Sequence, residues 1–299
     1  MNYKILPEIT NKQKEILEII IKLRFVNRHQ IQRLLRHKDA KRINVWLKDL
    51  VTKEYLGRIY SHKLLENTKP AIYYLNNNGI IWARYNYQSF SNNEGEVEIK
   101  HLKKFYEDKN ASKTFINHCI LISEIYTQFK IFEYLKNKGK KESEIEYEIS
   151  SKTENWIEKL NQVSSTEEFN NIKRFIPDLY VEKFKYKGNE TIEDNCFMIE
   201  VFDPKMPKYA IKHRIKQYIR LKEEKNELAL YENMHGEFPK IILIFPNFHI
   251  MNFYIKFIND ELMYSYEEPK ITFLLTTYQK IMTDTILGGE KVWKIIKEE

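Results

Sequence analysis

The sequence predicts an α/β protein with two domains, a basic helical domain that ends in a hairpin and an α/β sandwich built on a mixed sheet. Helical apolar stripes and two strand-like runs fill residues 10–75, whereas helical and strand-like segments alternate over residues 115–276. Charge divides the chain in the same way. Residues 1–86 hold 17 Lys and Arg against 7 Asp and Glu, a net charge of +10, so the remainder carries −3 because the whole chain carries +7. This asymmetry indicates a basic end that binds a polyanion and a body that does not.

Three helices are predicted at the start of the chain. Thr10 and Gln13 form a capping-box pattern ahead of the first helix, and Asn27 is the predicted N-cap of the second. A third helix spans residues 40–51. One of its faces is apolar, with Ile43, Leu47, Leu50 and Val51. Its opposite face carries Lys41, Arg42, Asn44, Val45 and Lys48.

Two strand-like runs, residues 56–60 and 71–75, follow the third helix and predict a basic hairpin. Two short helices followed by such a hairpin are the plan of a winged helix-turn-helix, which lays its second helix in a groove of double-stranded DNA. Cations on these elements would bind phosphates, and the amide of Asn44 would read a base edge. An ordinary solvated helix face is the alternative interpretation, but the charges of the adjacent hairpin favour DNA. The predicted DNA-binding residues are Arg28, Lys41, Arg42, Asn44, Lys48, Arg58, His62, Lys63 and Lys69.

The remaining elements follow in order. Residues 76–79 predict a turn before a short closing helix, so the first domain is assigned to residues 1–87. The polar residues 88–113 are predicted to be a connecting segment, which is in part helical around residues 99–106. The second domain, residues 114–299, opens with a predicted helix at 115–134. Further helices are predicted at 209–224 and 252–260. Strands are predicted at 142–150, 177–181, 196–202, 240–246 and 271–276, and the continuous apolar run at 240–246 indicates a strand buried on both faces.

Several classes of protein are excluded by the composition. No apolar run reaches the roughly 20 residues that span a bilayer, and the first residues lack the apolar core of a secretion signal, so a cytoplasmic protein is expected. Cys119 and Cys196 are the only cysteines, and we expect both to be reduced thiols. The sequence has no Gly-rich phosphate loop, which argues against an ATPase, and no paired-His cluster of the kind that a strand-transferring relaxase uses.

Seven short segments, in this order, carry a resemblance that covers nearly the whole chain. They are residues 73–79, Asn117-His118, Pro177-Asp178, residues 200–203, residues 214–218, residues 243–246 and residues 273–277. With them the chain resembles the replication-relaxation family, DNA-binding proteins of plasmids and other mobile elements. The resemblance implies a role in plasmid replication or in DNA relaxation and transfer. The partners it implies are double-stranded DNA, replication or mobilisation proteins, and a second copy of the chain in a homodimer.

The second domain is also similar to the PD-(D/E)xK nuclease fold. Carried over by position, Glu124, Asp178 and Glu200 would be its catalytic acids, and Asp178 and Glu200 would hold Mg²⁺ if the domain is active. The departure from the family pattern is Phe202, which stands where the water-activating Lys belongs. Lys205 would be its replacement from the next loop, with Lys212 and Lys216 as alternatives.

Three interpretations of these carboxylates stay open: solvated strand-end residues, a nuclease-like scaffold without catalysis, and metal-dependent cleavage with a migrated Lys. Three functions also stay open. A sequence-specific DNA-binding protein of a mobile element, acting at a replication or transfer origin or as a regulator, needs no cofactor. A metal-dependent endonuclease delivered by the winged helix needs Mg²⁺. The third function is an adaptor whose winged helix binds another protein.

Overall fold

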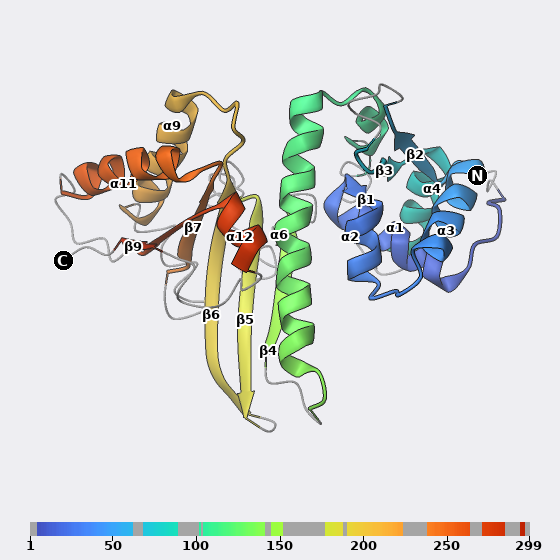
Figure 1. The fold of residues 1–299 in the computed structure, drawn as a ribbon, viewed down its shortest axis with the longest axis horizontal. Helices are drawn as coiled ribbons and strands as arrows, with labels where there is room; N and C mark the ends of the chain where they lie inside the picture. The colour runs from blue at the N-terminus through green and yellow to red at the C-terminus, as the bar shows by residue number, and fades with distance from the viewer. Residues whose placement is uncertain are drawn as a thin grey trace. The chain divides into compact units, whose positions relative to one another are not determined.

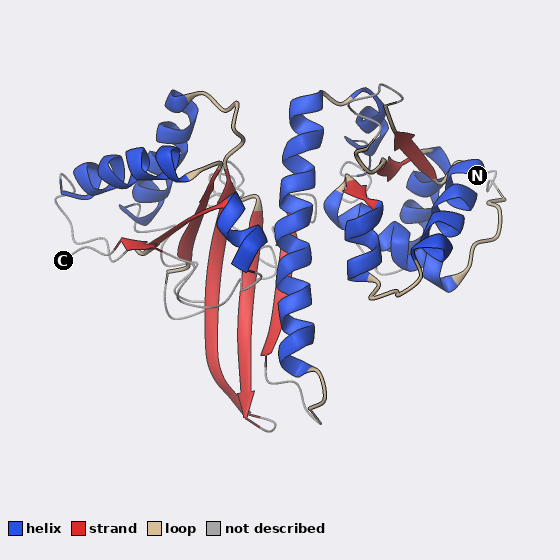
Figure 2. Ribbon diagram, in the orientation of Figure 1, coloured by secondary structure: helices blue, strands red, loops and turns tan. Residues whose placement is uncertain are grey.

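The computed structural model describes residues 5–61, 68–88, 102, 104–140, 145–151, 177–187, 190–223, 238–263, 271–284 and 294–296. It contains helices and two sheets, so the predicted α/β class is confirmed (Figures 1 and 2). The chain divides into two compact units, residues 1–127 and residues 128–299. The division falls inside the long helix α6 (Lys113–Asn137), whose first part belongs to the N-terminal unit and whose last part belongs to the C-terminal unit.

The N-terminal unit contains the predicted helices and hairpin in the predicted order. Its elements are α1 (Asn11–Leu23), β1 (Val26–Asn27), α2 (Arg28–Leu34), α3 (Ala40–Thr52), β2 (Leu56–Ile59), β3 (Ile72–Leu75), α4 (Asn77–Gln88), the 3₁₀ helix η1 (Lys104–Asn110) and the start of α6. The three strands form an antiparallel sheet in the order β1-β3-β2. The two-residue strand β1 was not predicted, because a pair of residues carries no readable period.

Side chains set the starts of these helices. Thr10 and Gln13 form the predicted capping box of α1, and Asn27 forms one with Gln30 at α2. Asp39 caps α3, because its Oδ1 accepts the backbone N–H groups of Lys41 at 2.8 Å and Arg42 at 3.3 Å. Each cap satisfies backbone donors that have no partner within the helix.

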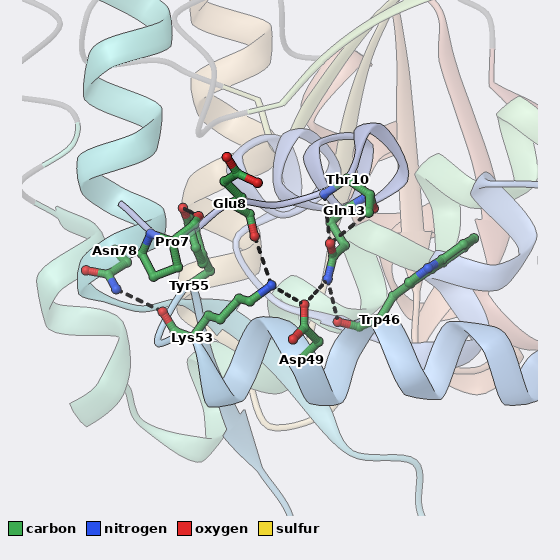
Figure 3. Close-up of polar contacts among 9 residues, drawn as sticks. All are labelled: Pro7, Glu8, Thr10, Gln13, Trp46, Asp49, Lys53, Tyr55 and Asn78. Carbon is green, nitrogen blue, oxygen red and sulfur yellow. Dashed lines mark hydrogen bonds and ion pairs between the residues drawn. The ribbon is translucent and has the colours of Figure 1, made fainter. Parts of the chain in front are cut away.

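A polar network behind α3 fixes that helix on α1 (Figure 3). The buried amide of Gln13 donates to Asp49 Oδ2 at 2.7 Å, and Lys53 Nζ donates to the same oxygen at 2.8 Å. Lys53 Nζ also donates to the backbone oxygen of Glu8 at 2.8 Å. Hydrogen bonds from Lys53 and Gln13 lower the pKa of Asp49, so this carboxylate is charged at neutral pH. The network therefore fixes one side of α3 against α1, and the opposite side of the helix is exposed to solvent.

The predicted turn at residues 76–79 is instead the beginning of a helix. α4 starts at Asn77, whose N–H donates to the Asn76 side chain at 2.9 Å. Gly79 lies inside the helix for a packing reason, since a Cβ atom there would stand 2.3 Å from the backbone oxygen of Tyr55. The asparagines and the glycine therefore serve a cap and a close backbone contact.

The predicted connection between the domains covers residues 88–113. Of these, the structure describes Gln88, Leu102 and residues 104–113. The segment forms η1, a 3₁₀ helix at residues 104–110, where the sequence suggested helix around residues 99–106. η1 packs on the N-terminal unit, where Arg24 forms an ion pair with the buried carboxylate of Asp108. Residues 104–110 of this segment therefore pack within the N-terminal unit.

The C-terminal unit is built on a six-stranded mixed sheet. Its elements after α6 are β4 (Ile145–Ser151), β5 (Leu179–Lys187), β6 (Glu190–Val201), α9 (Lys208–Glu223), β7 (Lys240–Phe245), α11 (Phe248–Met263), β8 (Phe273–Thr277), α12 (Tyr278–Asp284) and β9 (Lys294–Ile296). The strand order is β4-β5-β6-β7-β8-β9. The pairs β6–β7 and β7–β8 are parallel and the others antiparallel, which confirms the predicted mixed sheet.

The β5–β6 hairpin is much longer than the sequence indicated (Figure 2). Strands were predicted only at residues 177–181 and 196–202, where the side chains are apolar. The outer part of the hairpin is polar, yet its backbone pairing continues to Lys187 and Glu190. Backbone hydrogen bonds extend a hairpin beyond the residues that the core buries.

α9 and α11 cover one face of this sheet (Figure 1). Their inner sides and the strands below form one apolar core, which includes Met198, Phe202, Ile215, Phe245 and Tyr254. β7 is buried at every position from Ile241 to Phe245, as the continuous apolar run predicts. The core thus fixes α9 directly above the end of β6, where Glu200, one of the predicted catalytic residues, lies.

Candidate nucleic-acid interface and buried carboxylates

A groove lies between α3 and the β2–β3 hairpin of the N-terminal unit. Its volume is about 610 Å³. Five of the nine residues predicted to bind DNA line it, namely Arg28, Asn44, Lys48, Arg58 and Lys69. They come from α2, α3, β2 and the segment that leads into β3. Side chains from four separate parts of the chain therefore line one cavity, and all the charged ones are cationic.

The outward side of α3 continues this basic surface. The predicted outward residues of this helix are all exposed, namely Lys41, Arg42, Asn44, Val45 and Lys48. The side chain of Val45 is exposed by 64% although it is apolar. Arg42 lies near Trp46, with its guanidinium carbon 5.8 Å from the ring centroid. The edge of His37 contacts the same ring, at 5.0 Å between centroids. Trp46 is thus half-buried under its neighbours, and the cations around it face outward.

The hairpin side of the groove combines cations with aromatic rings. Arg58 is exposed and its guanidinium carbon lies 4.8 Å from the ring centroid of Tyr60. Burial raises the pKa of Tyr73, against the effect of Arg58 and Arg28, so its hydroxyl in the groove is neutral. Lys69 is exposed in the segment that leads into β3. His62 and Lys63, also predicted to bind DNA, lie outside the described residues.

Glu124, the first of the predicted catalytic acids, lies in the N-terminal unit and is buried there. Its Oε2 accepts from the guanidinium of Arg33 and from the amide of Gln30 at 3.1 Å. Gln30 also donates to the backbone oxygen of Ile120 at 3.1 Å, and the hydroxyl of Ser123 donates to the backbone oxygen of Phe25 at 2.8 Å. These bonds fasten α2 to α6. In this setting the carboxylate orients the helix that precedes α3.

Asp178 and Glu200 lie in the C-terminal unit, at neighbouring ends of β5 and β6, and both are buried. The N–H of Val201 donates to Asp178 Oδ2 at 2.9 Å. Glu200 Oε1 accepts from the guanidinium of Arg214, with Nε at 2.8 Å, and from the hydroxyl of Tyr218 at 2.7 Å. Arg214 and Tyr218 stand one turn apart on α9, so a single helix face supplies both donors.

The electrostatics of this cluster favour a charged pair. Burial acts to lower the pKa of Arg214, but Glu200 and Tyr218 outweigh it and the pKa lies above its ordinary value. Burial, followed by the charge of Glu200, raises the pKa of Tyr218 well above its ordinary value. Tyr218 therefore remains a neutral donor and Arg214 a cation, and the two hold the Glu200 carboxylate between them.

Phe202 follows Glu200 on the same side of β6, because side chains alternate along a strand. It is buried in the core below α9, with its ring centroid 5.0 Å from that of Phe245. Lys205 is exposed in the loop after β6, and its backbone N–H donates to Asp203 Oδ1 at 2.8 Å. Within the described part of the chain, no group of three or more His, Cys, Asp or Glu side chains is arranged to hold a metal ion.

Three features of these sites were not predicted: Asp39 as the cap of α3, the Arg33–Glu124 pair and the Arg214–Glu200 pair. For Arg214 a signal was present. It falls on the inner face of α9 among Ile211, Ile215 and Ile219, and a cation on an apolar face predicts a buried partner. Asp39 also had a local signal, because an Asp directly before an amphipathic run is a common N-cap. The Arg33–Glu124 pair joins residues 91 positions apart, for which the sequence gives no local sign.

Comparison with known proteins gives one family match. No curated protein and no solved structure matches the chain significantly. None of the described helices is long and apolar enough to cross a membrane. The model of the replication-relaxation family matches residues 17–241, from α1 through α3, α6 and α9 to the first strand residues of β7, about three quarters of the chain. The chain is therefore a member of the replication-relaxation family.

Proposed function

We propose that the N-terminal unit is a winged helix-turn-helix that binds double-stranded DNA in a sequence-specific manner, and that the chain acts in replication initiation, in DNA relaxation and transfer, or in their regulation. Membership of the replication-relaxation family supports a role in replication or relaxation. The observation that carries the proposal is the groove between α3 and the hairpin, because four cations and an amide from separate segments line it.

α3 is the element that enters the major groove. Its exposed N-terminal residues, Lys41 and Arg42, and the adjacent Asn44 are placed as in recognition helices, which contact base edges near their N-terminal ends. Asn44 pairs well with adenine, and the exposed side chain of Val45 offers an apolar contact to a thymine methyl group. Arg28, Arg58 and Lys69 then bind phosphates on either side and set the position of the helix.

The C-terminal unit serves as a scaffold without nuclease activity. Two of the acids that a nuclease would use are engaged with protein donors, Glu200 with Arg214 and Tyr218, and Asp178 with the N–H of Val201. The guanidinium already supplies the positive charge that Mg²⁺ would bring to Glu200. The position of the water-activating Lys is an apolar ring in the core. This donor set does not fit a magnesium centre, and the function proposed for this unit is recruitment of a second copy or of a replication protein.

The test begins with selection of bound duplexes from a random library, followed by fluorescence anisotropy on the selected duplex over a range of NaCl concentrations. Lys48→Ala and Arg58→Ala should weaken binding to all duplexes, and each should reduce the salt slope by about 1. Asn44→Ala should instead relax the sequence preference, with a loss of about 1–3 kcal/mol on the selected duplex and little loss on others.

Lys12→Ala is the matched control, because Lys12 is an exposed cation on α1 that does not line the groove. It removes the same charge and should leave both affinity and salt slope close to those of the wild type. Equal effects of Lys12→Ala and Lys48→Ala, or binding that does not depend on salt, would refute the proposed interface. A winged helix that bound a protein partner instead would select no duplex from the library.

A further inference from the structure

A second basic surface occurs on the C-terminal unit, far from the groove in sequence. Residues 204–220 contain six Lys and Arg and neither Asp nor Glu. The unit as a whole, residues 128–299, holds 27 Lys and Arg against 29 Asp and Glu. Cations are therefore concentrated on α9 in a unit that is otherwise slightly acidic. Only Arg214 of the six points into the core, where it holds Glu200.

Aromatic rings lie among these cations. α9 and α11 pack against each other (Figure 1), and the outward sides of the two helices carry Tyr209, Phe248 and Phe253, exposed by 76%, 64% and 44%. Lys208 Nζ lies 5.1 Å from the ring centroid of Phe253, and Lys212 Nζ lies 5.5 Å from it. We define the α9–α11 face as Lys208, Tyr209, Lys212, Lys216, Phe248 and Phe253.

The core does not explain these rings. The inner sides of α9 and α11 are already filled by buried residues such as Ile215, Tyr218 and Tyr254. The exposed rings lie on the other side of the helices, where large apolar groups gain little from folding. Among the residues that the structure describes, α11 brings Glu261 to this face, where it pairs with Lys216 at 2.8 Å, and it also carries the exposed Asp260. The face therefore stays cationic.

We propose that the α9–α11 face binds single-stranded nucleic acid. Proteins that bind single strands without sequence preference combine a cationic track for the phosphates with exposed rings on which bases stack. Both components are present here, and Lys208 and Lys212 lie beside Phe253, so that one nucleotide can place its phosphate and its base at the same time. In duplex DNA the bases are stacked on each other and cannot reach Phe253. An unpaired strand is therefore the polyanion that this face fits.

This site is separate from the duplex-binding groove, and its test separates the two. Full-length protein is titrated into a fluorescein-labelled oligothymidylate and, in parallel, into a labelled duplex, and the anisotropy is recorded. Phe253→Ala and Tyr209→Ala should each weaken oligothymidylate binding by about 5- to 100-fold, the range for loss of one stacked base. Both variants should bind the duplex like the wild type, whereas Lys48→Ala should show the opposite pattern.

Two matched controls and one conservative variant complete the test. Tyr106→Ala removes an exposed ring from the N-terminal unit, and Lys187→Ala removes an exposed cation from the β5 end of the hairpin in the same unit as α9. Neither should change oligothymidylate binding. Phe253→Trp should retain binding, and its additional emission, measured against the wild type, should be quenched when a base stacks on the indole.

Three outcomes would overturn the proposal. The first is oligothymidylate binding that none of the ring variants weakens. The second is equal competition by heparin, a polyanion without bases, combined with unchanged affinity of Phe253→Ala. That result would assign the face to acidic protein segments or to polyanions in general. The third is Phe253→Trp emission that the oligonucleotide does not change. Circular dichroism of each variant shows that the fold is retained, as expected for side chains this exposed.

Discussion

Substitution of Arg214 by Met isolates the charge pair that distinguishes a scaffold from a nuclease site. The side chains of Glu200 and Arg214 are exposed by only 7% and 17%. Loss of the guanidinium leaves Glu200 with Tyr218 as its remaining side-chain donor from α9. Removal of one partner from a buried pair costs about 3–5 kcal/mol of stability. The Glu200 carboxylate can take up a proton when it has lost its cation, so the cost of this protonation is an upper limit for the loss of stability. Protonation of a carboxyl of ordinary pKa about 4.3 costs about 3.7 kcal/mol at pH 7.

Because Glu200 can be protonated, the destabilisation by Arg214→Met depends on pH. A carboxylate that loses its cation in the folded state has a raised pKa there, so the folded variant binds a proton that the unfolded chain releases above about pH 4.3. The destabilisation by Arg214→Met should therefore grow with pH above this value. Protonation at pH 5 costs only about 1 kcal/mol. A loss of packing alone would be the same at both pH values.

Hydrogen exchange followed by mass spectrometry measures the effect where it occurs, in the peptides of β6 and α9. The chain has two units, so one global unfolding fit would mix them. Lys216→Met is the control on the same helix. Its pair with Glu261 has side chains exposed by 42% and 30%, and its loss should cost less than about 1 kcal/mol.

A double variant decides the interpretation. Replacement of both Glu200 and Arg214 by Met removes both charges of the pair and should recover most of the stability that Arg214→Met loses. If the two single losses simply add in the double variant, or if Arg214→Met is equally destabilising at pH 5 and pH 7, the two side chains are not coupled as a buried pair and the reasoning fails.

Three further outcomes are expected. Incubation with Mg²⁺ or Mn²⁺ should leave supercoiled plasmid intact on an agarose gel, and nicking that is lost in both Asp178→Ala and Glu200→Ala would instead identify a nuclease. Burial, followed by the charge of Arg24, lowers the pKa of Lys104 to about 8. The unfolded chain therefore binds more protons between about pH 8 and the ordinary value of about 10.5, so Lys104 should make the N-terminal unit more stable as the pH rises across that window. Proteolysis in urea, followed by mass spectrometry of peptides from the N-terminal unit, should show a smaller rise for Lys104→Met. Gly79→Ala should cost about 1–3 kcal/mol, measured by hydrogen exchange in the peptides of α4, because the added Cβ would stand 2.3 Å from a backbone oxygen. A neutral effect would show that α4 shifts freely.

Local sequence patterns determined much of the N-terminal unit. The starts of two helices are marked in the sequence, the first by Thr10 with Gln13 and the second by Asn27, and the structure has both caps. The amphipathic period of residues 40–51 also separated the buried face of α3 from its cationic face correctly. These features depend on neighbours within one turn of a helix, so the sequence alone carries them.

The C-terminal unit shows where local patterns fail. The run at residues 240–246 predicts a buried strand because every side chain is apolar, and β7 occupies it. In the outer part of the β5–β6 hairpin Phe184, Tyr186 and Ile192 are scattered among charged residues, so no apolar run marks the strands and the pairing partner defines them. The predicted turn at residues 76–79 failed for a related reason, since the role of Gly79 is set by the backbone of Tyr55.

The sequence by itself determined the family segments, the basic first unit and the residues on the outward side of α3. Tertiary structure alone decided which charges have partners: Arg33 meets Glu124 and Arg214 meets Glu200 across 91 and 14 residues of chain. A carboxylate at a strand end can have the same local sequence whether it binds a metal ion or a guanidinium group. The partner comes from another element, and packing of the core below α9 selects it.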